Sequence, residues 1–253
     1  MTLDYIYHSG FALEAEGVTL VLDFYQDTLP DDPSHGLVQD SLLQRPGRMY
    51  VLASHFHPDH FNPRVLAWKE RRPDICYLFS KDILKHRRAA ADDALYLSKG
   101  DTYADDCLRV DAFGSTDVGV SFMISLQGMR LFHAGDLNNW HWKAESTPAE
   151  VRKAEGDFRA ELNFIRRSYD AADVVLFPVD RRLGEDYMRG PRQFIETIRT
   201  GMFVPMHFGE DYEGGNAFRL VAEERGCRFC AIGHRGERFD LSVGGQTKTV
   251  STI

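Results

Sequence analysis

Four metal-ligand side chains stand within six residues of one another early in the chain. They directly follow the apolar stretch 49–53, typical of a buried strand, in the run Ser54-His55-Phe56-His57-Pro58-Asp59-His60. Side chains two residues apart at a strand end project to the same face, so His55 and His57 can reach one metal ion. Asp59 and His60 add a carboxylate and a third imidazole, a donor set that suits Zn²⁺ or another first-row metal. The sequence therefore predicts a metal-binding loop, with a metal-free, His-rich surface turn as the alternative.

The elements that position this loop can be predicted from hydrophobic period and turn residues. We expect strands at 5–7, 11–13, 18–24, 49–53, 75–79, 108–112, 120–124, 130–134, 174–177, 202–206, 228–232 and 248–251. We expect helices at 63–72 (with Asn62 as N-cap), 83–91, 148–169, 191–199 and 216–225. Gln127-Gly128 should form a hairpin turn, and 28–46 a polar loop. This order predicts a single α/β domain over residues 1–253, with sheets packed together and helices outside.

The composition is that of an acidic globular protein. The chain has 253 residues, is 43% hydrophobic and carries a net charge of -8. Nucleic acids and anionic membranes attract basic surfaces, so this charge argues against both as partners, although a local basic pocket for a phosphorylated substrate is compatible with it. The first residues lack the features of a signal peptide, and no apolar stretch approaches the ~20 residues that span a bilayer. We expect a cytoplasmic enzyme that acts on a small molecule.

The cysteines do not indicate a disulfide framework, because there are only four of them. Cys227 and Cys230 have the spacing of half a zinc ribbon or of a redox pair. Cys76 and Cys107 do not supply the second pair that a structural zinc site needs. We interpret the Cys227–Cys230 stretch as part of a buried strand.

The His-x-His-x-Asp-His run after an apolar strand resembles the signature of the metallo-β-lactamase superfamily. Further parts of that pattern follow in the expected order, at Val21-Leu22-Asp23, Phe132-His133-Ala134-Gly135-Asp136 and Pro205-Met206-His207-Phe208. The opening Tyr7-His8-Ser9-Gly10-Phe11 is similar to the branch that includes ascorbate-6-phosphate lactonase-like and phosphodiesterase-like proteins. The resemblance implies an α/β fold, a four-layer αββα sandwich.

The resemblance also implies two metal sites that share Asp136. The first would use His55 and His57, and the second would use Asp59, His60 and His207. One or two Zn²⁺ ions are expected, with Mn²⁺ or Fe as alternatives. Taken alone, Asp136 is also compatible with a turn residue after Gly135, and His207 with a buried core histidine.

The chain departs from the family pattern at one place. The family supplies a further His to the first site, but residues 113–119 of this chain contain none. Asp117 could replace it as a ligand or as a group that orients one. Alternatively, His8 could move in, or the first site could be weak.

Two further loops have the composition of a small-molecule pocket. Residues 137–142 hold two Trp, two Asn and His141, which offer apolar walls with polar anchors. The same Trp side chains could instead pack the following helix onto the core. Residues 180–189 hold three Arg, which suit planar anions but are equally compatible with surface salt bridges.

These residues together predict a metal-dependent hydrolase that uses a metal-activated water on an ester, a lactone or a phosphoester. Asp59 could orient the nucleophile, and His141 or His8 could protonate the leaving group. Two alternatives remain. One is a di-iron redox protein on the same fold, and the other is a non-catalytic binding or sensor protein.

Overall fold

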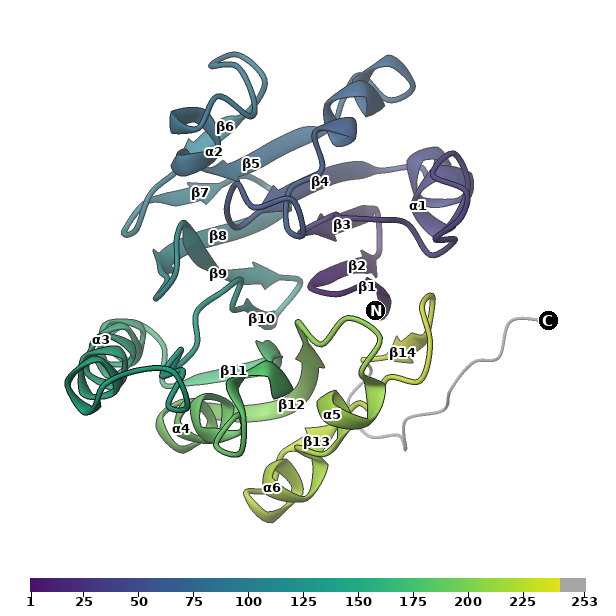
Figure 1. The fold of residues 1–253 in the computed structure, drawn as a ribbon. Helices are drawn as coiled ribbons and strands as arrows, with labels where there is room; N and C mark the ends of the chain where they lie inside the picture. Colours follow the sequence, from purple (N-terminus) through teal and green to yellow (C-terminus); the bar gives the residue numbers. More distant parts are fainter. Residues whose placement is uncertain (242–253) are drawn as a thin grey trace. The chain divides into compact units, whose positions relative to one another are not determined.

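The structure is a computed structural model that describes residues 1–241, so the strand predicted at 248–251 lies outside the described residues. The chain divides into two units. The first comprises Met1–Tyr96 and the described residues from Gly233 onward, and the second comprises Leu97–Ile232. Each unit is built on one seven-stranded sheet among the described residues (Figure 1). The prediction of a single domain stays a prediction.

The sheet of the first unit places four strand ends along one edge. Its order is β14 (Arg238–Asp240), β1 (Thr2–Tyr7), β2 (Gly10–Ala15), β3 (Val18–Leu22), β4 (Arg48–Ala53), β5 (Cys76–Ser80) and β6 (Leu95–Leu97). β2 pairs antiparallel with both β1 and β3, whereas β3, β4 and β5 run parallel. The carboxyl ends of β1, β3, β4 and β5 therefore share an edge, and the residues that follow them can meet there.

One face of this sheet is buried under short helical segments. These are α1 (Leu37–Asp40), the 3₁₀ helices η1 (Leu42–Gln44) and η2 (Pro63–Glu70), and α2 (Lys81–Lys85). Val38, Leu42, Trp68 and Ile83 from these segments join a hydrophobic cluster with strand residues such as Val51. Burial of this apolar surface is the main stabilising contribution to the unit.

Three predictions in the first unit need correction. The prediction of a plain loop at 28–46 is wrong, because α1 and η1 lie in this stretch and bury Val38 and Leu42. The helix predicted at 63–72 is a 3₁₀ helix, although Asn62 does cap it by accepting from the backbone N–H of Arg64 at 3.0 Å. The helix predicted at 83–91 begins earlier and ends at Lys85.

The sheet of the second unit has the order β13 (Arg228–Phe229), β12 (Arg199–Met206), β11 (Ala171–Pro178), β10 (Met129–His133), β9 (Val120–Leu126), β8 (Leu108–Gly114) and β7 (Thr102–Ala104). Strands β7 to β10 are antiparallel, and β10 to β13 are parallel. The predicted hairpin is confirmed, with Gln127 and Gly128 at φ 48° and 82° between paired Leu126 and Met129. The ends of β10, β11 and β12 share one edge.

Helices of the second unit contact both its sheet and one another. They are α3 (Pro148–Arg166), the 3₁₀ helix η3 (Arg181–Leu183), α4 (Arg189–Thr197), α5 (Tyr212–Asn216) and α6 (Arg219–Glu224). α3 packs on β8 and α4, α4 on β12, and α6 on β13 (Figure 1). α3 begins with a capping box in which Thr147 and Glu150 bond each other's backbone N–H.

Some elements of the second unit also differ from the predictions. The helix predicted at 216–225 is present but shorter, as α6, and the preceding short helix α5 was not predicted. The strand predicted at 228–232 keeps only Arg228–Phe229, flanked by buried Cys227 and Cys230. The short strands β6, β7 and β14 were not predicted. No described helix is both long and apolar enough to span a membrane.

Candidate metal-binding residues

In the first unit, the candidate residues follow three strands that end at the same edge. His8 follows β1, Asp23 follows β3, and the His-rich run follows β4. Because these strands point the same way, residues far apart in sequence come together after the strand ends. His55, His60 and Asp23 are fully buried or nearly so.

Asp23 holds the His-rich run in place, a role that we did not predict from the sequence. Its backbone N–H donates to Leu52 O at 2.9 Å. Its carboxylate accepts from the N–H and the hydroxyl of Ser54 at 2.7 and 2.6 Å. The same carboxylate accepts from Nδ1 of His60 at 2.7 Å. One buried side chain therefore fixes both the start and the end of the loop.

These bonds also fix which imidazole nitrogen is protonated. His60 donates its Nδ1 proton to Asp23, so in the neutral imidazole its Nε2 carries the lone pair. The Ser54 hydroxyl uses its proton on Asp23 and therefore accepts from Nδ1 of His55, 2.9 Å away. The Nε2 of His55 consequently carries a lone pair as well. A carboxylate behind Nδ1 with Nε2 presented outward is the usual arrangement around metal-binding histidines.

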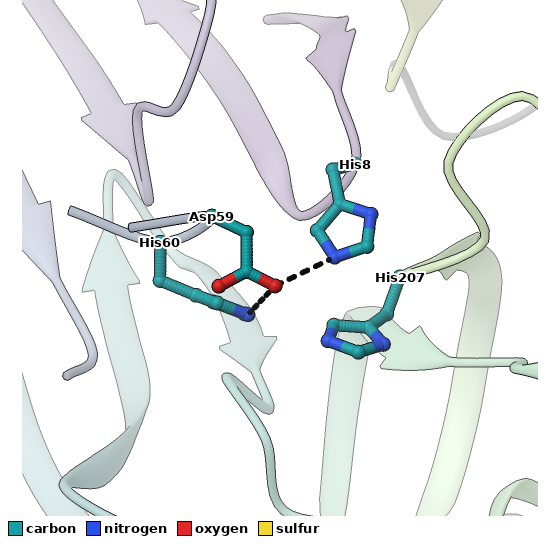
Figure 2. Close-up of side chains that lie close together, drawn as sticks. All are labelled: His8, Asp59, His60 and His207. Carbon is teal, nitrogen blue, oxygen red and sulfur yellow. Dashed lines mark ion pairs between the residues drawn. The ribbon is translucent and has the colours of Figure 1, made fainter. Parts of the chain in front are cut away.

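The ligand atoms of His8, Asp59 and His60 cluster in the first unit (Figure 2). Asp59 Oδ2 lies 3.3 Å from His8 Nε2 and 3.9 Å from His60 Nε2. The ligand atoms of His55 and His57 lie within 4.8 Å of one another. The structure thus brings together Asp59 with His60, and His55 with His57, as the resemblance implied. It places His8 beside Asp59 and His60.

Functional side chains at these strand ends have unusual backbone geometry. His8 and Asp23 have φ values of 59° and 42°, and His207 in the second unit has 64°. This left-handed region is uncommon for residues other than glycine. Each of the three immediately follows a strand, so the backbone turns sharply while it presents the side chain.

In the second unit, Asp136 and His207 meet after two parallel-sheet strands. Asp136 lies three residues beyond β10, and His207 directly follows β12. His207 Nε2 is 3.2 Å from Asp136 Oδ1, while its Nδ1 is 3.0 Å from Asp180 Oδ2. Asp180 therefore orients His207 as Asp23 orients His60. This role of Asp180, which follows β11, was not predicted.

Hydrogen bonds keep the carboxyl group of Asp180 ionised. Burial alone would raise the pKa of this carboxyl, but the bonds from His207 and Arg182 outweigh it and hold the pKa well below its usual range. Arg182 contacts both carboxylate oxygens, with Nε distances of 2.9 and 3.0 Å. Asp180 thus stays ionised and accepts the Nδ1 proton of His207.

Asp117 occupies a position compatible with the ligand role considered for it. Its carboxylate and that of Asp136 have ligand atoms within 4.8 Å of one another. Thr116 holds the two loops together, because it donates to Asn138 O at 2.5 Å and accepts from Asn138 N–H at 3.0 Å. Asn138 in turn lies so close to Gly190 that a Cβ there would be 1.8 Å from Asn138 Oδ1.

The aromatic loop after Asp136 packs two tryptophans near His207 and buries His141. The indole N–H of Trp140 donates to Asp136 O at 2.7 Å, and its ring lies 5.5 Å from that of His207. Trp142 stacks on Trp140 at 6.1 Å. His141, by contrast, is buried, with Nε2 3.3 Å from Asp186 O and Nδ1 accepting from the N–H of Lys143. Both ring nitrogens of His141 are therefore bonded to backbone.

The arginines of residues 180–189 have carboxylate neighbours. Arg181 lies 3.5 Å from Asp211 and Glu213, and Arg189 lies 2.7 Å from Glu155. These contacts favour the salt-bridge interpretation over an anion pocket at this place.

The donor chemistry fits metal binding in each unit. Imidazole and carboxylate ligands suit Zn²⁺, Mn²⁺ and Fe. In the second unit His207 Nε2 lies 3.2 Å from a carboxylate oxygen of Asp136, a separation at which a proton or a cation lies between the two atoms. The ligand assignments of His55, His57, Asp59, His60, Asp136, His207 and Asp117 stay predictions.

Comparison with known proteins supplies the family. A model of the β-lactamase superfamily domain matches residues 2–151, more than half of the chain. The chain belongs to the β-lactamase superfamily. The predicted superfamily and its αββα fold class are thereby confirmed, whereas the lactonase-like branch stays a prediction.

Individual relatives agree with this assignment. A curated protein of Desulforamulus reducens, described as a UPF0173 metal-dependent hydrolase, is 24% identical over 88% of each chain. A metallo hydrolase from Ignicoccus hospitalis has a similar structure, with a TM-score of 0.65, 20% identity, and coverage of 94% of this chain and 98% of its own. A diiron β-hydroxylase from Streptomyces venezuelae matches with a TM-score of 0.63 and 14% identity, over 98% of this chain and 54% of its own. The two structural matches show a shared fold.

Proposed function

We propose that this protein is a metal-dependent hydrolase that uses a metal-activated water on a small-molecule ester, lactone or phosphoester. The observation that carries the proposal is the orientation of its histidines. His60 and His207 each direct Nδ1 to a buried carboxylate and Nε2 to a second carboxylate, as metal-binding imidazoles do. Similarity to proteins described as metal-dependent hydrolases supports the same reaction class.

The metal ligands would be His55, His57, Asp59 and His60 in the first unit and Asp136 and His207 in the second. Asp117 would complete the set in place of the family's further His. When bound, one or two ions of Zn²⁺, or of Mn²⁺ or Fe, would polarise the substrate oxygen and lower the pKa of a water molecule toward neutrality.

The chain's own residues have distinct tasks in this proposal. Asp23 and Asp180 hold the imidazoles in one tautomer and one direction. Asp59 orients the attacking water. His8 gives a proton to the leaving group, a role that fits its position, since His8 Nε2 lies 3.3 Å from Asp59 Oδ2. His8 suits this task better than His141, whose ring nitrogens are bonded to backbone. Trp140 supplies an apolar wall beside His207.

We also propose that the protein works in the cytoplasm without a nucleic-acid or membrane partner. The net charge of -8 supports this, because such partners select basic surfaces.

Elemental analysis and a hydrolysis screen test the proposal together. We expect the purified protein to contain zinc, manganese or iron, and to hydrolyse at least one of a panel of 4-nitrophenyl esters, lactones and phosphodiesters. The variant His55→Ala/His57→Ala should lose both metal and activity. His35→Ala is the matched control, since His35 is exposed and paired with Asp40 on the surface. Normal metal content and activity in the double variant would refute the ligand assignment.

The same measurements separate the two alternatives. Near-stoichiometric iron with a visible absorption band would indicate a di-iron redox protein. Tight ligand binding without hydrolysis of any compound in the panel would indicate a binding or sensor protein.

A further inference from the structure

A cluster of exposed cations follows β5 in the first unit. Residues 81–88, here called the basic segment, comprise α2 and the turn after it. Lys81, Lys85, Arg87 and Arg88 are all exposed, as is His86, and Asp82 is the only acidic residue among them. This concentration of positive charge is unusual in a chain whose net charge is -8.

The cations of the basic segment are not neutralised by ion pairs. No carboxylate of residues 1–241 lies within 4.0 Å of the charged groups of Lys81, Lys85, Arg87 or Arg88. Many exposed cations elsewhere are paired, such as Lys153 with Asp157 and Arg225 with Glu196. Unpaired cations crowded on one short segment raise the local positive potential and favour an anionic ligand.

The basic segment is attached to the His-rich loop. Phe56 stands between His55 and His57, and its backbone N–H donates to Asp82 Oδ2 at 3.1 Å. The rings of Phe56 and His86 stack, with centroids 3.7 Å apart and planes 13° apart. β4 and β5 are parallel, so the segment begins at the edge of the sheet where the His-rich loop begins. The basic segment is therefore anchored to the loop that carries His55 and His57.

We propose that the basic segment binds the phosphate group of a small-molecule substrate. Arg offers forked donors and Lys a mobile ammonium, and together they suit the several oxygens of a phosphate. This proposal rests on the hydrolase function proposed above, because only a hydrolase would have a substrate here. It narrows the substrate class to phosphorylated compounds. The phosphate is the group that the protein recognises, and a different bond of the substrate is cleaved.

Equilibrium binding of inorganic pyrophosphate to the purified protein tests this without any turnover. We expect calorimetry to show binding that weakens as salt is raised, because the contacts are exposed. The variant Lys85→Gln/Arg87→Gln/Arg88→Gln should bind about tenfold more weakly or worse. Arg87→Lys/Arg88→Lys keeps the charge but loses the forked donors, so its affinity should fall between those of the wild type and the triple variant.

A charge-matched control separates local binding from a change in net charge. Lys153→Gln/Arg159→Gln/Arg225→Gln also removes three positive charges, but from cations that are paired in the second unit. We expect this variant to bind pyrophosphate within about twofold of the wild type, since exposed pairs have little influence elsewhere.

Two results would overturn the proposal. One is unchanged pyrophosphate affinity in the triple variant of the basic segment. The other is binding of a short single-stranded oligonucleotide that is tighter than pyrophosphate binding and is lost in the same variant, which would indicate a nucleic-acid surface. Hydrolysis of neutral 4-nitrophenyl acetate by the wild type is measured separately. A protein that hydrolyses nothing, yet loses pyrophosphate affinity in the triple variant, would overturn the proposed function and keep the phosphate site.

Discussion

Single carboxylates behind the histidines organise the candidate ligands of each unit. Asp23 accepts from Ser54 and His60, and Asp180 accepts from His207 and Arg182. Each therefore determines which imidazole nitrogen is free of a proton. At the scale of the residue, affinity for a metal depends on these supporting groups as well as on the ligands.

Asp23→Asn tests the role of this support. The amide has one oxygen in place of two, so it cannot accept from both Ser54 and His60 in the same way. We expect zinc affinity to fall about 10- to 100-fold, as measured by competition with a chromogenic chelator. Asp31→Asn, at an exposed carboxylate, should leave the affinity unchanged. Unchanged affinity in Asp23→Asn would show that the buried network does not orient a ligand.

A second prediction concerns Asp4, a buried residue of β1. Burial raises its pKa to about 6, although Arg238 donates to it at 2.7 Å and lowers it. The folded-state pKa exceeds that of the unfolded chain, so folding is favoured more below pH 4 and this contribution is lost as pH rises through about 6.

The expected effect of Asp4 is a loss of stability on the order of 2–3 kcal/mol between about pH 4 and pH 6. We expect urea unfolding to show this fall in the wild type and to lack it in Asp4→Asn. Asp31→Asn should keep the wild-type profile. Parallel profiles for wild type and Asp4→Asn would contradict the prediction.

The sequence predicted ligands but missed the groups that hold them. His55 and His57 could be singled out as candidate ligands because a spacing of two in a strand is a local signal. The partnership of Asp180 with His207 spans 27 residues, and that of Thr116 with Asn138 spans 22. Such partners depend on which strands become neighbours, and no local pattern encodes that.

At the scale of elements, close packing leaves no room for a Cβ atom at some glycines. Gly190 in α4 faces Asn138, and a Cβ there would also lie 2.9 Å from the backbone nitrogen of Asn139. Gly156 in α3 has no heavy atom within 4 Å of the same position. Gly156 is therefore a matched control for substitutions of Gly190, because both glycines lie in helices and only one is crowded.

We expect opposite results from alanine at these two sites. Gly190→Ala should destabilise the protein by about 1–3 kcal/mol, because the loop after Asp136 must move. Gly156→Ala should stabilise it by about 0.5–1 kcal/mol, because alanine is a better helix former. Thermal unfolding measures both, and similar shifts in the two variants would contradict the packing argument.

Strands were easier to predict than short helices. Long apolar runs, such as those of β4 and β9, were found at nearly their observed positions, whereas the run in β11 gave only its central half. The helix predicted at 83–91 failed because Arg87 has φ 56°, which ends the helical backbone. The strands β6 and β7 have three residues each, too few for a period to be recognised.

At the scale of the whole molecule, the metal should contribute to stability. Candidate ligands occur in both units of the chain, and a ligand that binds only the folded state stabilises it by mass action. Removal of metal with a chelator should lower the melting temperature by roughly 5–10 °C, if the ion is present at about 100 times its Kd. Added Zn²⁺ should restore the original value.

The variant His55→Ala/His57→Ala provides the control for this shift. It should melt at the same temperature with and without chelator. An equal effect of chelator on this variant and on the wild type would show that the ion binds elsewhere.

The positive φ angles of His8, Asp23 and His207 also affect how the protein can be engineered. A left-handed backbone at a residue other than glycine costs on the order of 1 kcal/mol, and glycine or asparagine would relieve that cost. Asp23 and His207 also hold buried hydrogen bonds, whose loss would cost more than the strain that is relieved. Directed evolution for heat resistance alone should therefore enrich glycine or asparagine at His8 only. A library screened for thermotolerance would need a simultaneous screen for turnover to keep this histidine.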